Sequence, residues 1–221
     1  MIEIDRDGIE VDEMSAYLTE DLKTEIAHGI EVSRLAGMLA KELKLDPEFC
    51  HDIEVAGMLH DIGKLRASTY LYGGDDDTLN VEKMRYVRLH AGLGYEVVKA
   101  EGYSDRICEM ILHHHENYDG TGYPDNLVGD EIPLGARVLR VCDVFVALTS
   151  DRPYRKAFDS KTAVELLIEE VRHFDMKVFL PFHSLESKCS CLPLNGALSV
   201  RNRSMDFYLR LQGDTQDKLV Y

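Results

Sequence analysis

The segment Thr24–Leu45, which reads TEIAHGIEVSRLAGMLAKELKL, decides the class of fold. Its apolar positions recur at steps of three and four, which is the spacing of one face of an α-helix. Together with one histidine, these positions are His28, Val32, Leu35, Leu39 and Leu43. Charged residues occupy the other faces, and Pro47 ends the pattern. The segment therefore predicts a core helix that carries a histidine on its buried face.

Helical spacing continues along most of the chain, with further helices expected at about 47–65, 81–101, 104–115, 134–150 and 160–172. The stretch 116–133 is rich in Gly and Pro and predicts a loop. Apolar residues alternate between 198 and 211, which predicts a short β-hairpin in the tail. We expect an all-α fold, a helical bundle with that hairpin as an appendage.

Composition restricts the classes of function. The chain has 221 residues, 45% of them hydrophobic, which suits one main globular domain without a membrane span. The N-terminus is acidic where a secretory signal is basic, so we expect a cytoplasmic protein. A net charge of −15 argues against binding to a nucleic-acid polymer. A small phosphorylated ligand remains compatible, because metal ions and a few basic side chains can meet its charge locally.

The pair His60-Asp61 closes the apolar run Val55–Leu59. A carboxylate in such company needs a partner, because an unpaired buried charge is costly. A metal ion supplies one. Lys64 lies one turn after His60 on the same face of the expected helix, where its ammonium group can meet a phosphate oxygen.

Other imidazoles and a second carboxylate share this apolar setting, namely His28, His90, His114 and Asp143. Each histidine alone is more typical of a hydrogen-bonded core residue, but together they favour a site. Side chains from separate helices can converge in the core of a bundle and form a dinuclear centre. Mixed nitrogen and oxygen ligands suit Fe, Mn, Ni or Zn better than Mg or Ca. Two such ions about 4 Å apart hydrolyse phosphodiesters by activating water and stabilising the entering and leaving oxygens.

Two motifs carry a family resemblance. His60-Asp61-Ile62-Gly63-Lys64 resembles the HD signature of metal-dependent phosphohydrolases, and residues 114–124, which read HHENYDGTGYP, match the HD-GYP signature. Leu127, Ile132-Pro133, Ala136-Arg137 and the run 151–155 follow in the order of that family. The resemblance covers about residues 24–180.

The resemblance implies an all-helical domain that hydrolyses cyclic di-GMP to the linear dinucleotide pGpG, and in some members onward to GMP. Carried over by position, the metal ligands are His28, His60, Asp61, His90, His114, His115 and Asp143, with Asp61 bridging two divalent ions, of which Fe or Mn is favoured over Ni or Zn. The catalytic residues are Asp61 and Lys64. The residues expected to hold the dinucleotide are Lys64, Tyr123, Arg152 and Arg155. His113 receives no role.

Two positions depart from the family pattern. Members with three metals have a glutamate where this chain has Thr24, and Glu25 is displaced by one residue, or about 100° around a helix. We therefore expect two metals. Val146 replaces an aspartate of many members, so a hydrogen bond behind Asp143 is expected to be missing.

We expect an N-terminal segment at 1–20 with no room for a preceding sensory domain, the HD-GYP domain at 21–184, and an appendage at 185–221 that serves either packing and dimerisation or regulation. Two alternatives to a cyclic di-GMP phosphodiesterase stay open. One is a phosphohydrolase for another nucleotide. The other is a catalytically weak HD-GYP module that binds cyclic di-GMP or a protein partner. A homodimer is also left open.

Overall fold

The computed structural model describes residues 11–65, 79–152 and 155–189, with side chains described for 23–65, 88–152 and 155–188. The described part contains seven α-helices and no strand, and its elements are α1 (Val11–Glu42), α2 (Pro47–Leu59), α4 (Leu79–Ala100), α5 (Asp105–Leu112), η1 (Gly129–Glu131), α6 (Leu134–Thr149), α7 (Ser160–Glu169), η2 (Val171–His173) and α8 (Met176–Cys189). The predicted all-α class is confirmed.

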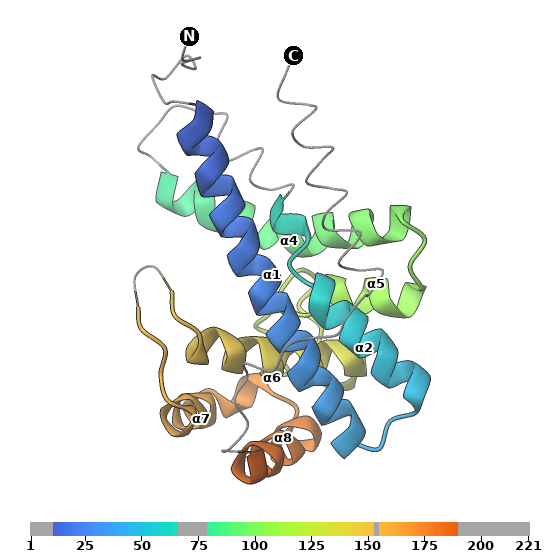
Figure 1. Cartoon of the computed structure of the whole chain (residues 1–221). Coiled ribbons are helices and arrows are strands. Elements are labelled where there is room, and N and C mark those ends of the chain that lie inside the picture. The colour runs from blue at the N-terminus through green and yellow to red at the C-terminus, as the bar shows by residue number, and fades with distance from the viewer. Residues whose placement is uncertain (1–10, 66–78, 153–154, 190–221) are drawn as a thin grey trace.

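The helices form a bundle around one apolar core (Figure 1). The long helix α1 packs along α2 and also contacts α6, while α5 contacts α2, α4 and α6. Helix α6 is buried along most of its length, and α7 and α8 pack against it. This arrangement surrounds the end of α2 with other helices, which is where the sequence places His60-Asp61.

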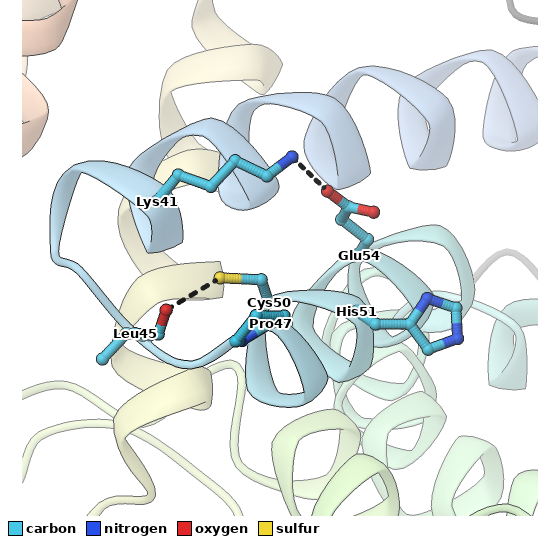
Figure 2. A pocket seen from close by; sticks show the side chains of 6 residues that line it. All are labelled: Lys41, Leu45, Pro47, Cys50, His51 and Glu54. Atoms are coloured by element: carbon cyan, nitrogen blue, oxygen red, sulfur yellow. Dashed lines mark hydrogen bonds and ion pairs between the residues drawn. The ribbon is translucent and has the colours of Figure 1, made fainter.

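The turn between α1 and α2 is set by local capping. Asp46 accepts a hydrogen bond from the backbone N–H of Phe49, and Pro47 occupies the first helical turn, where its missing N–H costs nothing. Figure 2 shows a hollow at this turn, bordered by an ion pair of 3.0 Å between Lys41 Nζ and Glu54 Oε1. The hollow shares no residue with the predicted site, so we assign it no part in the chemistry.

Two helices extend across the domain limits that we expected. Helix α1 begins at Val11 and runs without a break across residues 20 and 21. Helix α8, which we did not predict, crosses residues 184 and 185. The sequence signal for α8 was obscured by Pro181, which lacks a backbone donor. Buried Phe179 and Phe182 nevertheless attach α8 to the core, so tertiary packing outweighs local preference.

The helix α5 is shorter than predicted, because it ends at Leu112 and the histidines that follow lie in a turn. The predicted hairpin at 198–211 lies outside the described residues. No helix in the described ranges is both long and apolar enough to cross a membrane.

Candidate metal centre

All seven predicted metal ligands come together in the core, as two groups that are each able to hold one ion. The first group contains Asp61, His90, His114 and His115, and the second contains His28, His60 and Asp143. Within each group the potential ligand atoms lie within 4.8 Å of one another. The members come from α1, the turn after α2, α4, the turn after α5, and α6. The site is therefore a product of tertiary packing.

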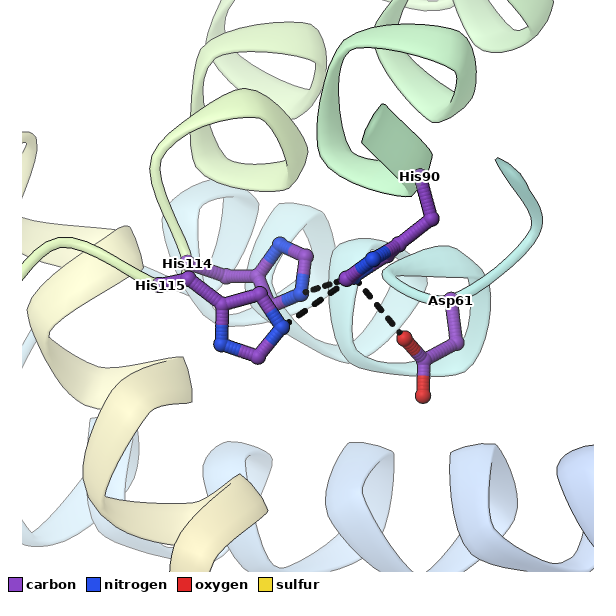
Figure 3. Close-up of side chains that lie close together, drawn as sticks. All are labelled: Asp61, His90, His114 and His115. Atoms are coloured by element: carbon purple, nitrogen blue, oxygen red, sulfur yellow. Dashed lines mark hydrogen bonds and ion pairs between the residues drawn. The ribbon is translucent and has the colours of Figure 1, made fainter. Parts of the chain in front are cut away.

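Asp61 faces both groups with its two carboxylate oxygens. Its Oδ1 lies 3.2 Å from His90 Nε2 in the first group. Its Oδ2 lies 3.2 Å from His60 Nε2 in the second. Figure 3 shows His90, His114 and His115 gathered opposite Asp61. A carboxylate in this position can ligate one ion through each oxygen.

A close backbone approach brings Asp61 to His90. A Cβ atom on Gly63 would lie 2.0 Å from the carbonyl oxygen of His90 and 2.6 Å from the backbone nitrogen of Gly94. Only glycine allows the turn after α2 to come so near α4. Gly63 therefore positions two of the predicted ligands, although it offers no ligand atom of its own.

Backbone carbonyls orient two of the imidazoles. Nδ1 of His60 donates to the carbonyl of Gly57 at 2.8 Å, and Nδ1 of His114 donates to the carbonyl of Ile111 at 2.6 Å. A hydrogen on Nδ1 leaves Nε2 as the ring nitrogen that faces the site. Histidines that bind metals are commonly held in this way by a partner at their other nitrogen.

Two further observations, the distances between ring nitrogens and the unpaired buried nitrogens, show that these side chains suit a metal ion. His90 Nε2 lies 3.2 Å from His114 Nε2 and 3.1 Å from His115 Nε2. Ligands about 2.1 Å from a common ion are about 3.0–3.4 Å apart, so these separations match. In addition, His28 Nδ1 and His60 Nε2 are buried without a hydrogen-bond partner. A cation between the carboxylates would give His60 Nε2 one.

The protonation of the first group favours ligation. Burial, reinforced by the neighbouring imidazoles, holds the pKa of His114 well below its usual value. Burial, opposed by Asp143, lowers the pKa of His115 to about 3. Both rings are therefore neutral at pH 7 and carry a free nitrogen lone pair. Metal ligation requires that form of histidine.

The carboxylates are ionised although they are buried. Burial opposes the charge of Asp61, but His60 and Lys64 outweigh it and hold the pKa of Asp61 well below its usual value. Burial likewise opposes the charge of Asp143, while the hydrogen bond from His28 lowers its pKa. His28 Nε2 lies 2.9 Å from Asp143 Oδ1. These paired carboxylates supply the negative charge that a divalent ion needs.

Lys64, which the sequence assigns to catalysis, lies at the edge of the centre. Its Nζ is 2.7 Å from Asp61 Oδ2 and 3.1 Å from Glu25 Oε2. Burial opposes its charge, but these two carboxylates raise the pKa of Lys64 above its ordinary value. The side chain therefore stays cationic at neutral pH, which suits a contact with phosphate and excludes a role as a base.

The two departures from the family pattern have visible structural counterparts. Thr24 is exposed, and the carboxylate of Glu25 pairs with Lys64 rather than with a histidine of either group. Val146 is fully buried within the apolar core. A charged side chain there would need a partner inside that core.

Tyr123 lies against the first group. Its ring stacks on His115 with 4.8 Å between the centroids, and its backbone N–H donates to the carbonyl of His115 at 3.3 Å. The loop that carries it is tightly folded, since a Cβ atom on Gly122 would lie 2.2 Å from the backbone nitrogen of Asn117. The ring is thus placed at the centre by its own loop.

The two predicted arginines pair with each other through their backbones. Arg152 N–H donates to the carbonyl of Arg155 at 2.8 Å, and the reverse bond measures 3.0 Å. The guanidinium of Arg155 donates to the carbonyls of Ala147 and Leu148 at the end of α6. A contact between Arg155 and a substrate would require these bonds to be exchanged, and its predicted role stays a prediction.

Sequence reasoning missed two basic residues near the centre. The guanidinium of Arg140 donates to Asn117 Oδ1 at 3.0 Å, and its charge opposes protonation of His115. Arg88 lies 5.3 Å above the ring of Tyr123. Arg140 precedes Asp143 by three residues, so helical spacing placed both on one face of α6. That spacing was the available signal.

The fold is an all-α bundle, and its core holds two adjacent groups of histidine and aspartate side chains that could each bind a metal ion. These two features are those of a helical metal-binding protein. A family described as HD domain matches residues 13–178. The chain belongs to the HD domain family. The HD-GYP resemblance carried by residues 114–124 is also confirmed.

Three curated proteins are similar in sequence to this chain. The "Cyclic di-GMP phosphodiesterase response regulator RpfG" of Xanthomonas campestris is 41% identical over 142 residues, covering 62% of this chain and 36% of the relative. "Cyclic di-GMP phosphodiesterase PA4108" of Pseudomonas aeruginosa is 36% identical over 70% of this chain and 37% of the relative. "3'3'-cGAMP-specific phosphodiesterase 1" of Vibrio cholerae is 34% identical over 69% and 36%. The chain thus spans little more than a third of the length of these relatives.

Solved structures resemble the fold. Bd1817, an HDG"Y"P protein from Bdellovibrio bacteriovorus, superimposes with a TM-score of 0.60 at 20% identity over 75% of this chain and 53% of that one. The HD domain of the L. monocytogenes phosphodiesterase PgpH in complex with cyclic-di-AMP gives a TM-score of 0.53 at 16% identity over 80% and 94%. At these identities the likeness establishes the fold alone.

Proposed function

We propose that this chain is a phosphodiesterase that uses two divalent transition-metal ions to hydrolyse cyclic di-GMP. The observation that carries the proposal is the position of Asp61 between two groups of nitrogen and oxygen ligands. One carboxylate shared by two such groups is typical of a dinuclear hydrolase site. Relatives named as phosphodiesterases of cyclic di-GMP support the choice of substrate.

The proposed ligands are His90, His114 and His115 for one ion, His28, His60 and Asp143 for the other, and Asp61 for both. Imidazole and carboxylate donors favour Fe or Mn, with Ni or Zn as alternatives. Two ions match the pairing of Glu25 with Lys64, which leaves that carboxylate outside both groups. When bound, the ions would lower the pKa of a water molecule and stabilise negative charge on the reacting phosphate.

The residues of the chain would bind and orient the substrate around these ions. Lys64 is cationic and adjoins Asp61, so its ammonium group can bind a non-bridging oxygen of the scissile phosphate. Arg140, three residues before Asp143, adds a second positive charge beside the centre. Tyr123 presents an aromatic face near His115, on which a guanine base can stack. Opening one phosphodiester would give linear pGpG, and opening the second would give GMP.

Turnover of cyclic di-GMP by the purified protein, loaded with Fe or Mn under reducing conditions, tests this proposal. We expect chromatography to show pGpG or GMP from the wild-type chain and neither product from Asp61→Ala, with metal content measured on both. Tight binding of cyclic di-GMP without product would instead support the signalling module. If the protein neither bound nor hydrolysed cyclic di-GMP, both the phosphodiesterase and the signalling module would be contradicted.

A second substrate has a specific observation in its favour, because the relative from Vibrio cholerae is named for 3'3'-cGAMP. The two dinucleotides differ in one base, so the metal centre treats their phosphates alike. Values of kcat/KM for both substrates, measured side by side, distinguish these functions. A higher value for cyclic di-GMP is expected.

A further inference from the structure

We infer that His113, Glu116 and Asp125 form a separate site for a divalent transition-metal ion, outside the centre described above. Among the described residues, these three make up another group whose potential ligand atoms lie within 4.8 Å of one another. Their side chains belong to neither of the two ligand groups around Asp61. The inference does not depend on the proposed hydrolysis.

Two buried atoms in this group lack a hydrogen-bond partner. His113 is 6% exposed and Glu116 is 1% exposed, yet His113 Nδ1 and Glu116 Oε2 are both unsatisfied. Leaving buried polar atoms unpaired is costly, so each calls for an explanation. An ion bound to His113 Nδ1 and held by both oxygens of the Glu116 carboxylate would remove both deficits.

The atoms around His113 Nδ1 favour a positively charged ligand. His113 Nε2 lies 3.1 Å from Glu109 Oε2, so the hydrogen of a neutral ring belongs on Nε2. Nδ1 then directs a lone pair toward Glu116 Oε1 and Asp125 Oδ2, each 3.8 Å away. Three electron-rich atoms that face one another at distances too long for hydrogen bonds leave room for a positive charge between them.

One imidazole and two carboxylates form a donor set that suits Zn²⁺ and similar ions better than Mg²⁺ or Ca²⁺. Water would complete the coordination, because the Asp125 carboxylate is 58% exposed. The side chains of His113 and Asp125 would need to approach by a few tenths of an ångström, which the exposed Asp125 can do.

The ion would close the loop that carries Tyr123. His113 caps the end of α5, and Asp125 follows Tyr123 by two residues. The loop is already folded back here, since the backbone N–H of Asp125 donates to Glu116 Oε1 at 2.7 Å. A bond from Asp125 to His113 through the ion would therefore hold Tyr123 in its stack on His115. The site would act as a structural clamp beside the reaction centre.

Zinc content provides the test. The full chain, four single variants and one double variant would be loaded with Zn²⁺, freed of excess metal by gel filtration and analysed for zinc per chain. We expect Asp125→Asn and His113→Gln to hold one zinc fewer than the wild type. Asp130→Asn, an exposed acid just beyond the same loop, should hold as much as the wild type. Asp61→Ala should lose zinc from the centre and still lose one more when combined with Asp125→Asn, which separates this site from the proposed hydrolase centre.

Crystals of the zinc-loaded protein add a direct readout. An anomalous difference peak about 2.1 Å from His113 Nδ1 is expected. Hydrogen exchange at residues 116–126 should slow with Zn²⁺ in the wild type and stay unchanged in Asp125→Asn. Equal zinc contents in the wild type and Asp125→Asn, or the absence of an anomalous peak among the three side chains, would overturn the inference. Asp125 is exposed, so its variant is expected to fold even if His113→Gln does not.

Discussion

Lys64 illustrates how much the role of a single residue depends on its neighbours. Its ammonium group lies between the carboxylates of Asp61 and Glu25, at 2.7 and 3.1 Å. These partners keep it positively charged and hold it beside the proposed metal ions. A phosphate that enters the centre would meet a cation whose position is already fixed, which lowers the entropic cost of the contact.

Replacement of Lys64 by glutamine should lower kcat/KM for cyclic di-GMP by about 10- to 100-fold, because a charge-assisted hydrogen bond to the phosphate is lost. Metal content should be unchanged, since Lys64 offers no ligand atom. The control is Lys41→Gln, which breaks a surface ion pair with Glu54 far from the centre. Equal kcat/KM in the two variants would exclude the role proposed for Lys64.

Tyr123 separates the effect of an aromatic ring from that of its hydroxyl. The ring stacks on His115 at 4.8 Å, and the side chain is half-buried. We expect Tyr123→Phe to keep the KM for cyclic di-GMP within about threefold. Tyr123→Ala should raise it by about tenfold, since a stacking contact is worth about 1–3 kcal/mol. Steady-state kinetics measures both values, and equal losses in the two variants would assign the effect to the hydroxyl.

At the level of elements, the site depends on how closely the turn after α2 approaches α4. A methyl group on Gly63 would overlap the carbonyl of His90, 2.0 Å away. We expect Gly63→Ala to lower the free energy of unfolding by about 1–3 kcal/mol and to weaken metal binding through displacement of His90. Denaturant titration and metal analysis measure these effects.

Gly92 lies on α4, two residues after His90, and supplies a matched control for Gly63. A Cβ atom there would meet nothing within 4 Å. Gly92→Ala should therefore stabilise the protein by about 0.5–1 kcal/mol, because alanine loses less backbone freedom in a helix. If Gly63→Ala and Gly92→Ala shifted the unfolding midpoint in the same direction, the close approach at Gly63 would not contribute to the free energy of unfolding.

The sequence was sufficient for most elements and for the seven residues that gather as the two groups in the core. Helical spacing located α1, α2, α4, α6 and α7, and the two motifs identified residues that the structure brings together. Periodicity alone does not say how close two helices come, so the contact between Gly63 and His90 was not foreseen. Charged residues on mostly apolar helices are equally hard to place, which is why Arg140 was overlooked. Helix α8 was missed because Pro181 gives a local signal that packing of Phe182 overrides.

At the scale of the whole molecule, α8 packs against α1 and α6 and spans residue 184, where we expected the HD-GYP domain to end. Phe182 is fully buried and its ring lies 5.2 Å from that of Phe145 on α6. Phe182→Ala should cost about 3–5 kcal/mol of unfolding free energy through lost burial and a cavity. Leu180→Ala, at a position 59% exposed on the same helix, should change it by less than about 0.5 kcal/mol. Similar effects of both changes in thermal unfolding would show that α8 is not docked.

Metal removal should also affect the whole molecule. Ions that bind only the folded chain stabilise it by about 2.7 kcal/mol for a site at a hundred times its Kd. A chelator is therefore expected to lower Tm by about 5–10 °C in a domain of this size. Calorimetry with and without chelator measures the shift. Asp61→Ala, which lacks the shared ligand, should respond much less, and equal shifts would place the stabilising metal elsewhere.

The wide separation of the ligands along the chain also imposes an order on biosynthesis. Asp61, His90, His114 and His115 are all present once residue 115 has been made, whereas the group of His28 and His60 lacks Asp143 until 28 residues later. Domains tend to fold as units during translation, and loop closure over such distances carries an entropic cost. A ribosome-bound chain that ends before residue 143 can therefore hold at most half of the proposed dinuclear centre.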